Sequence, residues 1–354
     1  MTILVMPVNV KRYKNHISVV VAIAMIYYLV EYVGFESLIS AFKMIDAKYL
    51  SIAIMLYGVT LTLNAHRWST IIGITGHIVG IKKALHFQMI DKAANSIFPT
   101  SAVGMALRSM LLKREFNIPK SKGFASIVLD YGFEIFGTFL LAVPALFILR
   151  DSLPSYVNAQ LYVCLGLLGL AAVGIAVVNH PHISIKINSR EPEQGIISRI
   201  SKKKYGSKIL EFLGTFTVLN SSPNNTYNAM GTTLGIRIVE AIRMMVLFKA
   251  FGISLPFYYF ILFESVWLFL SPFMITPGGI GAVESGRILL YSMLPQFTAS
   301  SVAPAVFIDR FITFWLMLLL GIVATLLYTR GVNGYGDAET KGFLGLPSAN
   351  SDIG

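Results

Sequence analysis

Charged residues are scarce in this sequence, which excludes an ordinary soluble globular protein. Only 13% of the 354 residues are charged, whereas 55% are hydrophobic and the mean hydropathy is +0.67. Soluble domains usually carry about 25% charged residues. Cysteine is nearly absent too, because Cys164 is the single one. An intrachain disulfide is therefore excluded, and we interpret Cys164 as a small buried apolar side chain.

The common signatures of catalysis are absent as well. The sequence has no Gly-x-x-x-x-Gly-Lys-Ser/Thr loop for ATP and no nucleophile elbow, and its six histidines form no metal-ligand pattern. The segment Gly279-Ile280-Gly281 begins like a dinucleotide fingerprint, but it follows no strand and lacks the third glycine. We therefore expect no catalytic residues, no cofactor and no metal site, and we predict that the protein is not an enzyme.

Long hydrophobic runs dominate what is present. A transmembrane helix needs about 20 mostly apolar residues. Six runs fit this requirement: Ile17–Gly34, Tyr49–Asn64, Phe124–Leu149, Leu161–Val178, Tyr227–Phe251 and Ser300–Tyr328. The first run follows basic residues as in a signal peptide, but no small-residue cleavage site follows it, so we interpret it as a retained span. The predicted fold class is an all-α polytopic membrane protein with about six transmembrane helices.

Basic residues are distributed unevenly between the predicted loops. Most of the 29 Lys and Arg residues fall in loops on one side, and the other side holds only Lys43, Lys48, Arg150, Lys249 and Arg287. By the positive-inside rule the basic side is cytoplasmic. We predict a multi-pass protein of the cytoplasmic membrane with both termini in the cytoplasm. The net charge of +11 then reports orientation, and we expect no nucleic-acid partner.

Two further apolar segments, Leu85–Leu112 and Phe257–Leu294, are each interrupted by proline and small residues. The pattern of spans and loops fits only if each segment enters and leaves the membrane on the same face. We therefore expect two re-entrant helical hairpins that open to opposite sides. Matched landmarks keep nearly one spacing: Arg67 and Arg243 lie 176 residues apart, Pro99 and Pro277 lie 178 apart, and Asp130 and Asp309 lie 179 apart. An inverted repeat with paired broken helices is typical of transporters.

This repeat divides the chain into four parts. Residues 1–178 form the first membrane half with hairpin 85–112, and residues 179–226 form a polar cytoplasmic linker. Residues 227–330 form the second membrane half with hairpin 257–294, and residues 331–354 form a disordered tail. The linker contains Lys202-Lys203-Lys204, which either attracts anionic headgroups or is an ordinary solvated loop.

Many charges lie within or beside the apolar segments, where each costs about 2.5–3.5 kcal/mol at a helix centre. They must therefore pair or face water. Asp130 and Glu134 share one helix face and need a basic neighbour from another helix. Asp309 and Arg310 point to different faces, so each needs its own partner. The remaining charges are Asp91, Lys92, Arg108, Arg237, Glu240, Arg243, Glu264, Glu284 and Arg287, of which Arg237, Glu240 and Arg243 either neutralise one another within a helix or face a ligand.

The helix breaks themselves carry candidate chemistry. Pro99 and Pro277 each remove a backbone donor and end a helix. The glycines after Pro277 leave bare amides at the start of the next helix, which suits an anion but also suits a tight packing turn. Two breaks at matched positions favour binding, and nearby arginines suit a lipid phosphate. For Arg67-Trp68 we favour interfacial anchoring over headgroup binding.

Several motifs recur along the membrane part of the chain, about residues 10–330: Arg67-Trp68, then Asn95, Pro99, Gly104 and Arg108, then Asp130, and above all Pro277-Gly-Gly-Ile-Gly-Ala-Val-Glu284. Together they resemble the lysylphosphatidylglycerol synthase transmembrane region, also called the flippase-like domain family. The resemblance implies movement of a phospholipid or polyprenyl-linked lipid between leaflets. In the namesake proteins a soluble aminoacyl-transferase domain follows. Only a short stretch follows the last span here, so we do not extend that activity to this chain.

We therefore predict a lipid flippase that holds the headgroup at the ends of the hairpin helices. The candidate binding residues are Arg67, Asn95, Pro99, Gly104, Arg108, Asp130, Glu134, Arg243, Glu264, Pro277, Gly278, Gly279, Gly281, Glu284, Arg287, Asp309 and Arg310. The expected partners are membrane lipids, either anionic phospholipid or polyprenyl phosphate. Glu134, Glu264, Glu284 and Asp309 are candidate proton carriers, although the sequence assigns no coupling ion.

Other functions stay open at this stage. A small-molecule or ion secondary transporter would use the same inverted frame and a closed aqueous cavity. A membrane-embedded enzyme on lipid-linked substrates would use the paired acidic residues, but no metal or nucleophile pattern supports it. A scaffold subunit that binds a partner enzyme of envelope biosynthesis, or a homodimer, is a further alternative.

Overall fold

The computed structural model describes residues 35–74, 76–97, 102–151, 155–178, 222–270 and 277–332. Within these ranges the chain is helical and contains no strand, which confirms the predicted all-α class. The first predicted span, most of the linker and nearly all of the tail (residues 17–34, 179–221 and 333–354) lie outside the described residues, as does Pro99.

The helices follow the order that the repeat predicts. The first half contains α2 (Phe35–Met44), α3 (Ala47–Ile74), α4 (Ile81–Ile97), α5 (Ala102–Phe116), α6 (Lys120–Leu149) and α7 (Ser155–Val178). The second half contains α11 (Pro223–Ala250), α12 (Phe257–Leu270), the short turn η3 (Pro277–Gly279), α13 (Ala282–Ser292), α14 (Ala299–Arg310), η4 (Phe311–Leu316) and α15 (Met317–Val332). By position in the network described below, α3, α4, α5 and α6 correspond to α11, α12, α13 and α14.

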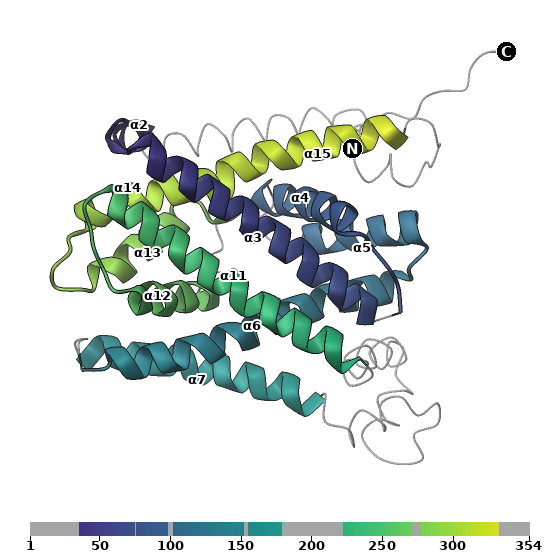
Figure 1. Cartoon of the computed structure of the whole chain (residues 1–354), viewed down its shortest axis with the longest axis horizontal. Helices are drawn as coiled ribbons and strands as arrows, with labels where there is room; N and C mark the ends of the chain where they lie inside the picture. Colours follow the sequence, from purple (N-terminus) through teal and green to yellow (C-terminus); the bar gives the residue numbers. More distant parts are fainter. Residues whose placement is uncertain are drawn as a thin grey trace, which may run out of the picture.

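The long helices α3 and α11 pack against each other at the centre of the molecule and run in opposite directions (Figure 1). His66, near the end of α3, contacts Asn228, near the start of α11, at 3.1 Å. Tyr57, earlier in α3, lies beside Arg243, late in α11. These two helices contain the matched residues Arg67 and Arg243, so the corresponding parts of the two halves are antiparallel.

Each predicted broken segment is indeed two antiparallel helices. At the open end of the first, Lys83 of α4 pairs with Glu115 of α5 at 2.5 Å. Near its tip, the amide of Gly104 donates to Oδ1 of Asn95 at 3.1 Å. A side chain at Gly104 would collide with the oxygens of Asp91 and Asn95, so glycine is needed there for α4 and α5 to approach. The predicted entry of this hairpin into the bilayer from one face stays a prediction.

The second hairpin is built from α12 and α13. The phenol of Tyr291 donates to Oε1 of Glu264 at 3.1 Å, and Tyr291 packs edge-on against Phe263. Phe248 of α11 contacts the ring of Tyr291, so the hairpin packs against the central pair of helices. This aromatic cluster lies within the main hydrophobic core. The core therefore fixes the position of the helix that carries Glu264.

Three described helices are long and apolar enough to cross a membrane: Ala47–Ile74, Lys120–Leu149 and Ala299–Tyr328. They contain three of the predicted spans. The predicted span Leu161–Val178 is helical as part of α7, and Tyr227–Phe251 lies almost entirely within α11, which contains Arg237, Glu240, Arg243 and Lys249. The total of six spans stays a prediction.

Exposed apolar side chains cover the outer faces of α15 and α7, which lie on opposite sides of the bundle (Figure 1). On α15 they are Leu319, Leu320, Ile322, Val323, Leu326 and Leu327, and on α7 they are Tyr162, Val163, Leu167, Leu170 and Val173. A soluble protein rarely exposes such continuous apolar surface. These faces fit a multi-pass membrane protein whose outer helices contact lipid.

The helix that ends the described chain contains a widened turn. η4 has π-helical geometry and follows directly after Asp309 and Arg310. Beyond it, Gly321 of α15 lies against Ala93 and the carbonyl of Met89 on α4. Single π-turns inside α-helices occur often at functional sites.

Candidate functional site

Buried ion pairs connect the helices of the first half. Nε of Arg67 on α3 donates to Oδ1 of Asp130 on α6 at 2.7 Å. Arg108 on α5 donates to Oδ2 of the same aspartate and to Oδ2 of Asp91 on α4, both at 3.1 Å. Asp91 in turn accepts from the side-chain amide of Asn95. All four charged side chains are buried, so they lie inside the protein rather than in its surface.

The second half repeats the same connections. Nε of Arg243 on α11 donates to Oδ1 of Asp309 on α14, again at 2.7 Å. Arg287 on α13 donates to Oδ2 of Asp309 and to Glu264 on α12. In both halves the aspartate lies between two arginines, one from the long helix and one from the second helix of the hairpin. The first helix of the hairpin supplies the other carboxylate.

The two networks also match in which arginine nitrogens have no hydrogen-bond partner within the described part of the chain. Nη1 of Arg67 and Nη1 of Arg243 have no hydrogen-bond partner among the described residues, and the same holds for Nε of Arg108 and Nε of Arg287. Since α3 and α11 are antiparallel, the two networks point in opposite directions along the bundle. This repeated geometry supports the predicted inverted repeat.

Aromatic rings cover the guanidinium groups. The Cζ atom of Arg108 lies 3.8 Å from the ring centre of Trp68, a contact that adds cation–π attraction. Trp68 and Arg67 are 0% and 1% exposed. The interpretation of this pair as an interfacial anchor is therefore wrong, because an anchor must reach the membrane surface. The two side chains instead lie inside the protein, where they are part of the first network.

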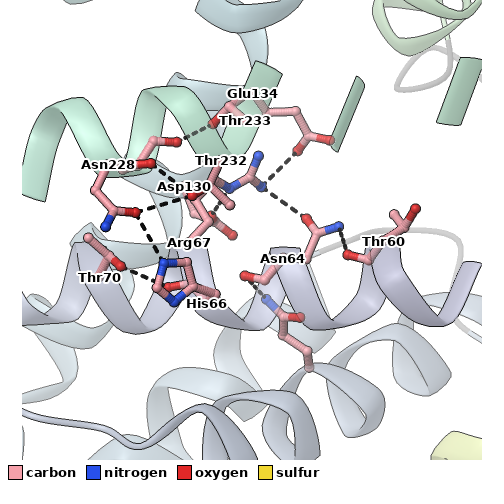
Figure 2. Close-up of polar contacts among 12 residues, drawn as sticks. Thr60, Asn64, His66, Arg67, Thr70, Asp130, Glu134, Asn228, Thr232 and Thr233 are labelled. Carbon is pink, nitrogen blue, oxygen red and sulfur yellow. Dashed lines mark hydrogen bonds and ion pairs between the residues drawn. The ribbon is translucent and has the colours of Figure 1, made fainter. Parts of the chain in front are cut away.

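A further group of three residues joins the first network to the central helix of the second half. Arg237 on α11 pairs with Glu134 on α6 at 2.5 Å and with Glu240 on its own helix at 2.8 Å. Nη2 of Arg67 also lies 3.8 Å from Oε2 of Glu134, and the same nitrogen donates to Oδ1 of Asn64 at 3.2 Å (Figure 2). We call Arg237, Glu134 and Glu240 the triad. Self-pairing within α11 is thus right for Arg237 and Glu240, whereas Arg243 pairs with Asp309.

The second half has its own addition. Nε of Arg310 donates to Glu284 at 2.8 Å, and Nη2 donates to the carbonyl of Gly278. Arg310 therefore ties α14 to the turn between α12 and α13. Gly278, Gly279 and Gly281 all have positive φ, which explains three glycines in this short turn. Asp309 and Arg310 have separate partners, as the sequence predicted.

The tips of the two broken segments meet. A Cβ atom added to Gly278 would lie 2.7 Å from the backbone carbonyl of Ser96, near the end of α4, and 2.6 Å from Phe314. Only a glycine permits this approach. Ser96 comes directly before the first break and Gly278 lies within the second, so the polar networks and the helix breaks occupy one region.

The structure thus brings most of the predicted site residues together, since every described carboxylate and arginine in that set belongs to one of the ion pairs. Sequence reasoning left Asp91, Arg237 and Glu240 out of the set, although it noted all three as charges within apolar segments. It also missed Trp68 and Tyr291. Asp91 had a local signal, because Asn95 stands four residues later on the same helix face.

Among the described residues, no group of three or more His, Cys, Asp or Glu side chains is arranged to hold a metal ion. The carboxylates are instead bonded to arginines, as in the pair of Asp130 with Arg67. The contacts that the structure shows at this site are charge-assisted hydrogen bonds between arginines and carboxylates.

Comparison with known proteins identifies relatives along almost the whole chain. Residues 15–321 match the family described as the lysylphosphatidylglycerol synthase TM region. A UPF0104 membrane protein of Methanothermobacter thermautotrophicus is 24% identical over 332 residues, which cover 88% of this chain and 95% of that protein. A UPF0104 membrane protein of Methanocaldococcus jannaschii is 23% identical over 92% of this chain and 98% of its own length. One from Pyrococcus horikoshii is 20% identical over 88% and 97%.

The match in sequence and the membrane-type helices agree with each other and with the motifs around the two breaks. The chain belongs to the lysylphosphatidylglycerol synthase TM region family.

Proposed function

We propose that this protein is a flippase that moves a phospholipid or a polyprenyl-phosphate-linked lipid between the two leaflets of the cytoplasmic membrane. The observation that carries the proposal is the pair of matched arginine–aspartate networks, antiparallel and joined where the two broken segments meet. A transporter needs one site that can be reached in turn from each side, and an inverted repeat supplies two equivalent approaches to it.

The energetics favour a transport role over a purely structural one. Each charge in a membrane segment is expensive, and a buried ion pair is often no more stabilising than apolar residues of the same volume. A helix bundle needs none of these pairs to be stable. A site that exchanges partners needs them, because an arginine bonded to Asp130 or Asp309 can instead bond a lipid phosphate.

The headgroup in this proposal lies at the hairpin ends while the acyl chains stay in the surrounding lipid. Arg108 and Arg287 are the principal phosphate ligands, because each already divides its donors between two carboxylates from different helices. A phosphate that replaces one carboxylate keeps the guanidinium bonded and loosens one helix from another. The protein carries out no chemical conversion in this scheme. Lipid use also fits the family name, which refers to a lipid-modifying synthase.

A small-molecule secondary transporter on the same frame is the second candidate. The deep burial of Asp309 and Arg243 favours it, because a small ion can enter a closed site that a lipid headgroup reaches only from the side. The two candidates differ in their substrate and can be separated in one assay.

The assay uses the full chain in liposomes with NBD-labelled phosphatidylglycerol, and dithionite reports the label that reaches the outer leaflet. The parent should make the inner pool accessible, and the Glu284→Gln, Arg287→Ala variant should not. A matched control is Lys83→Gln with Glu115→Gln, which removes an ion pair at the open end of the first hairpin. Equal lipid movement by the parent and the network variant would count against the proposal, as would no movement by the folded parent.

A further inference from the structure

The buried networks contain more carboxylates than guanidinium groups, and the excess carboxylate lies in the triad. The repeated core of each half is neutral, because two arginines face two carboxylates: Arg67, Arg108, Asp91 and Asp130 in one half, and Arg243, Arg287, Glu264 and Asp309 in the other. The pair of Arg310 with Glu284 is neutral as well. The triad alone has one guanidinium and two carboxylates. The network therefore contains one surplus negative charge.

The triad is also the part of the first network that the repeat does not reproduce. With the spacing that relates Arg67 to Arg243, Arg237 and Glu240 correspond to Leu61 and Asn64. With the spacing that relates Asp130 to Asp309, Glu134 corresponds to Thr313. All three counterparts are uncharged. The surplus carboxylate is thus present in only one of the two matched networks, and the repeat does not account for it.

The neighbouring charges do not remove the surplus. Glu134 faces Arg67 of α3 and Arg237 of α11, and Asp130 precedes it on α6. Arg67 is already bonded to Asp130. The described part of α7, which also packs on α6, has no charged residue. Lys92 forms no ion pair with a described residue and lies on α4 beside Asp91, which is bonded to Arg108.

Glu240 has one ion-pair partner among the described residues. It pairs with Arg237, and the charged or titratable groups within electrostatic reach are Arg67 and Tyr57 of α3, Arg243 of its own helix and Glu264 of α12. Arg243 is bonded to Asp309 of α14, and the neighbouring Arg310 is bonded to Glu284. Glu264 adds further negative charge.

The two carboxylates of the triad are the most exposed acidic side chains of the network. Their side chains are 19% and 20% exposed, whereas Asp309 is fully buried and Asp91 and Glu284 are 5% exposed. An unbalanced charge in a low-dielectric site costs several kcal/mol, and a carboxylate avoids this by taking up a proton. Because their side chains are partly exposed, Glu134 or Glu240 can take up a proton without opening the core pairs.

We propose that lipid movement is coupled to a proton carried by the triad. A proton from water binds a carboxylate oxygen of Glu134 or Glu240, and that side chain becomes a neutral acid. Arg237 then keeps only one of its two anionic partners. Arg237 then has a free donor for an anionic phosphate oxygen. A proton and a singly charged headgroup enter together, so the net charge of the network does not change. On the other side the headgroup leaves and the proton returns to water. This inference rests on the proposed function and adds its cosubstrate.

The test measures lipid and proton movement in the same liposomes. The full chain is reconstituted with NBD-phosphatidylglycerol, and trapped pyranine reports internal pH. Movement should fall as the external pH rises, by up to about tenfold per pH unit, because only the protonated form of the triad carries lipid. Glu240→Gln alone, and Glu134→Gln with Glu240→Gln, should move lipid at a rate independent of pH and without proton flux. Within the described residues Glu240 forms one ion pair, with Arg237, and it is partly exposed, so the single variant should fold even where the double variant does not.

The matched control is Glu115→Gln, which removes a partly exposed carboxylate outside the network and should keep the pH dependence of the parent. Loss of pH dependence and proton flux in the triad variants alone supports the inference. Lipid movement by the parent that is equal at every pH, with no change in internal pH, overturns it and leaves the proposed function intact. Parent-like pH dependence in the double variant overturns it as well. Absence of lipid movement by the folded parent at every pH overturns both proposals.

Discussion

Gly278 lies directly against the backbone carbonyl of Ser96, and this contact joins the two helix breaks. Ser96 lies one residue before the end of the first helix of one hairpin, and Gly278 lies in the turn of the other. Arg310 holds the same turn through the carbonyl of Gly278. A displacement of either hairpin therefore changes the packing of the other, which is the property that alternating access requires.

This contact predicts that Gly278→Ala destabilises the protein by about 2–4 kcal/mol, through a strained positive φ and a collision with Ser96. Thermal unfolding in detergent measures the loss. Gly252→Ala is the control, because Gly252 also has positive φ but has open space around it. Equal losses in the two variants would show that the collision contributes nothing.

The matched networks predict matched energetics. Arg67→Gln and Arg243→Gln should each destabilise by about 3–5 kcal/mol, because each leaves a buried aspartate without one of its arginines. Lys83→Gln should cost no more than about 1 kcal/mol, since Lys83 is exposed and its partner Glu115 is partly exposed. Chemical unfolding of the three variants gives the comparison. A small loss for either network variant would contradict the prediction.

The aspartate and its arginine should also be coupled. Arg243→Gln combined with Asp309→Asn should be less destabilising than the sum of the single changes, with an interaction of about 1–3 kcal/mol. A double-mutant cycle on unfolding free energies measures this value. Additive losses would mean that the pair contributes only through its separate neighbours.

Close packing inside the first hairpin predicts that Gly104→Ala lowers lipid movement. The added methyl group would push α5 away from Asp91 and Asn95 and so lengthen the bonds of Arg108. The expected loss of stability is about 1–3 kcal/mol. Gly235→Ala, where no atom lies within 4 Å, is the control and should leave both stability and movement unchanged. Dithionite accessibility of labelled lipid and thermal unfolding are measured on the same preparations.

Local patterns predicted a large part of this arrangement. The spacing of Arg67 with Arg243 and of Asp130 with Asp309 identified residues that occupy equivalent places in the two networks. Adjacent residues on different helix faces predicted separate partners for Asp309 and Arg310, as found. These inferences succeeded because they depend on helix periodicity and on the cost of unpaired charge, both of which are visible in a single sequence.

Other features depend on contacts between distant helices and leave no local pattern. Trp68 beside Arg67 has the composition of an interfacial anchor, and only its packing beneath Arg108 shows that it is internal. The spacing of 176–179 residues did not identify Asp91 and Glu264 as a matched pair, because these two residues lie only 173 residues apart. The bond of Arg237 to Glu134 joins helices that are far apart in the chain. Neither the partner nor the surplus charge could be inferred before the helices were placed.

The π-helical turn Phe311–Leu316 has a consequence for how the last helix docks. A wide turn contains about one residue more than an α-helical turn, and each residue rotates a helix by about 100°. This rotation lets Asp309 face the arginines while Gly321 faces Ala93. If the same residues formed a regular α-helix, Gly321 would be turned about 100° away from Ala93 and a bulkier neighbouring side chain would face it instead. The last helix would then stand away from the first hairpin and leave a seam open to the surrounding lipid.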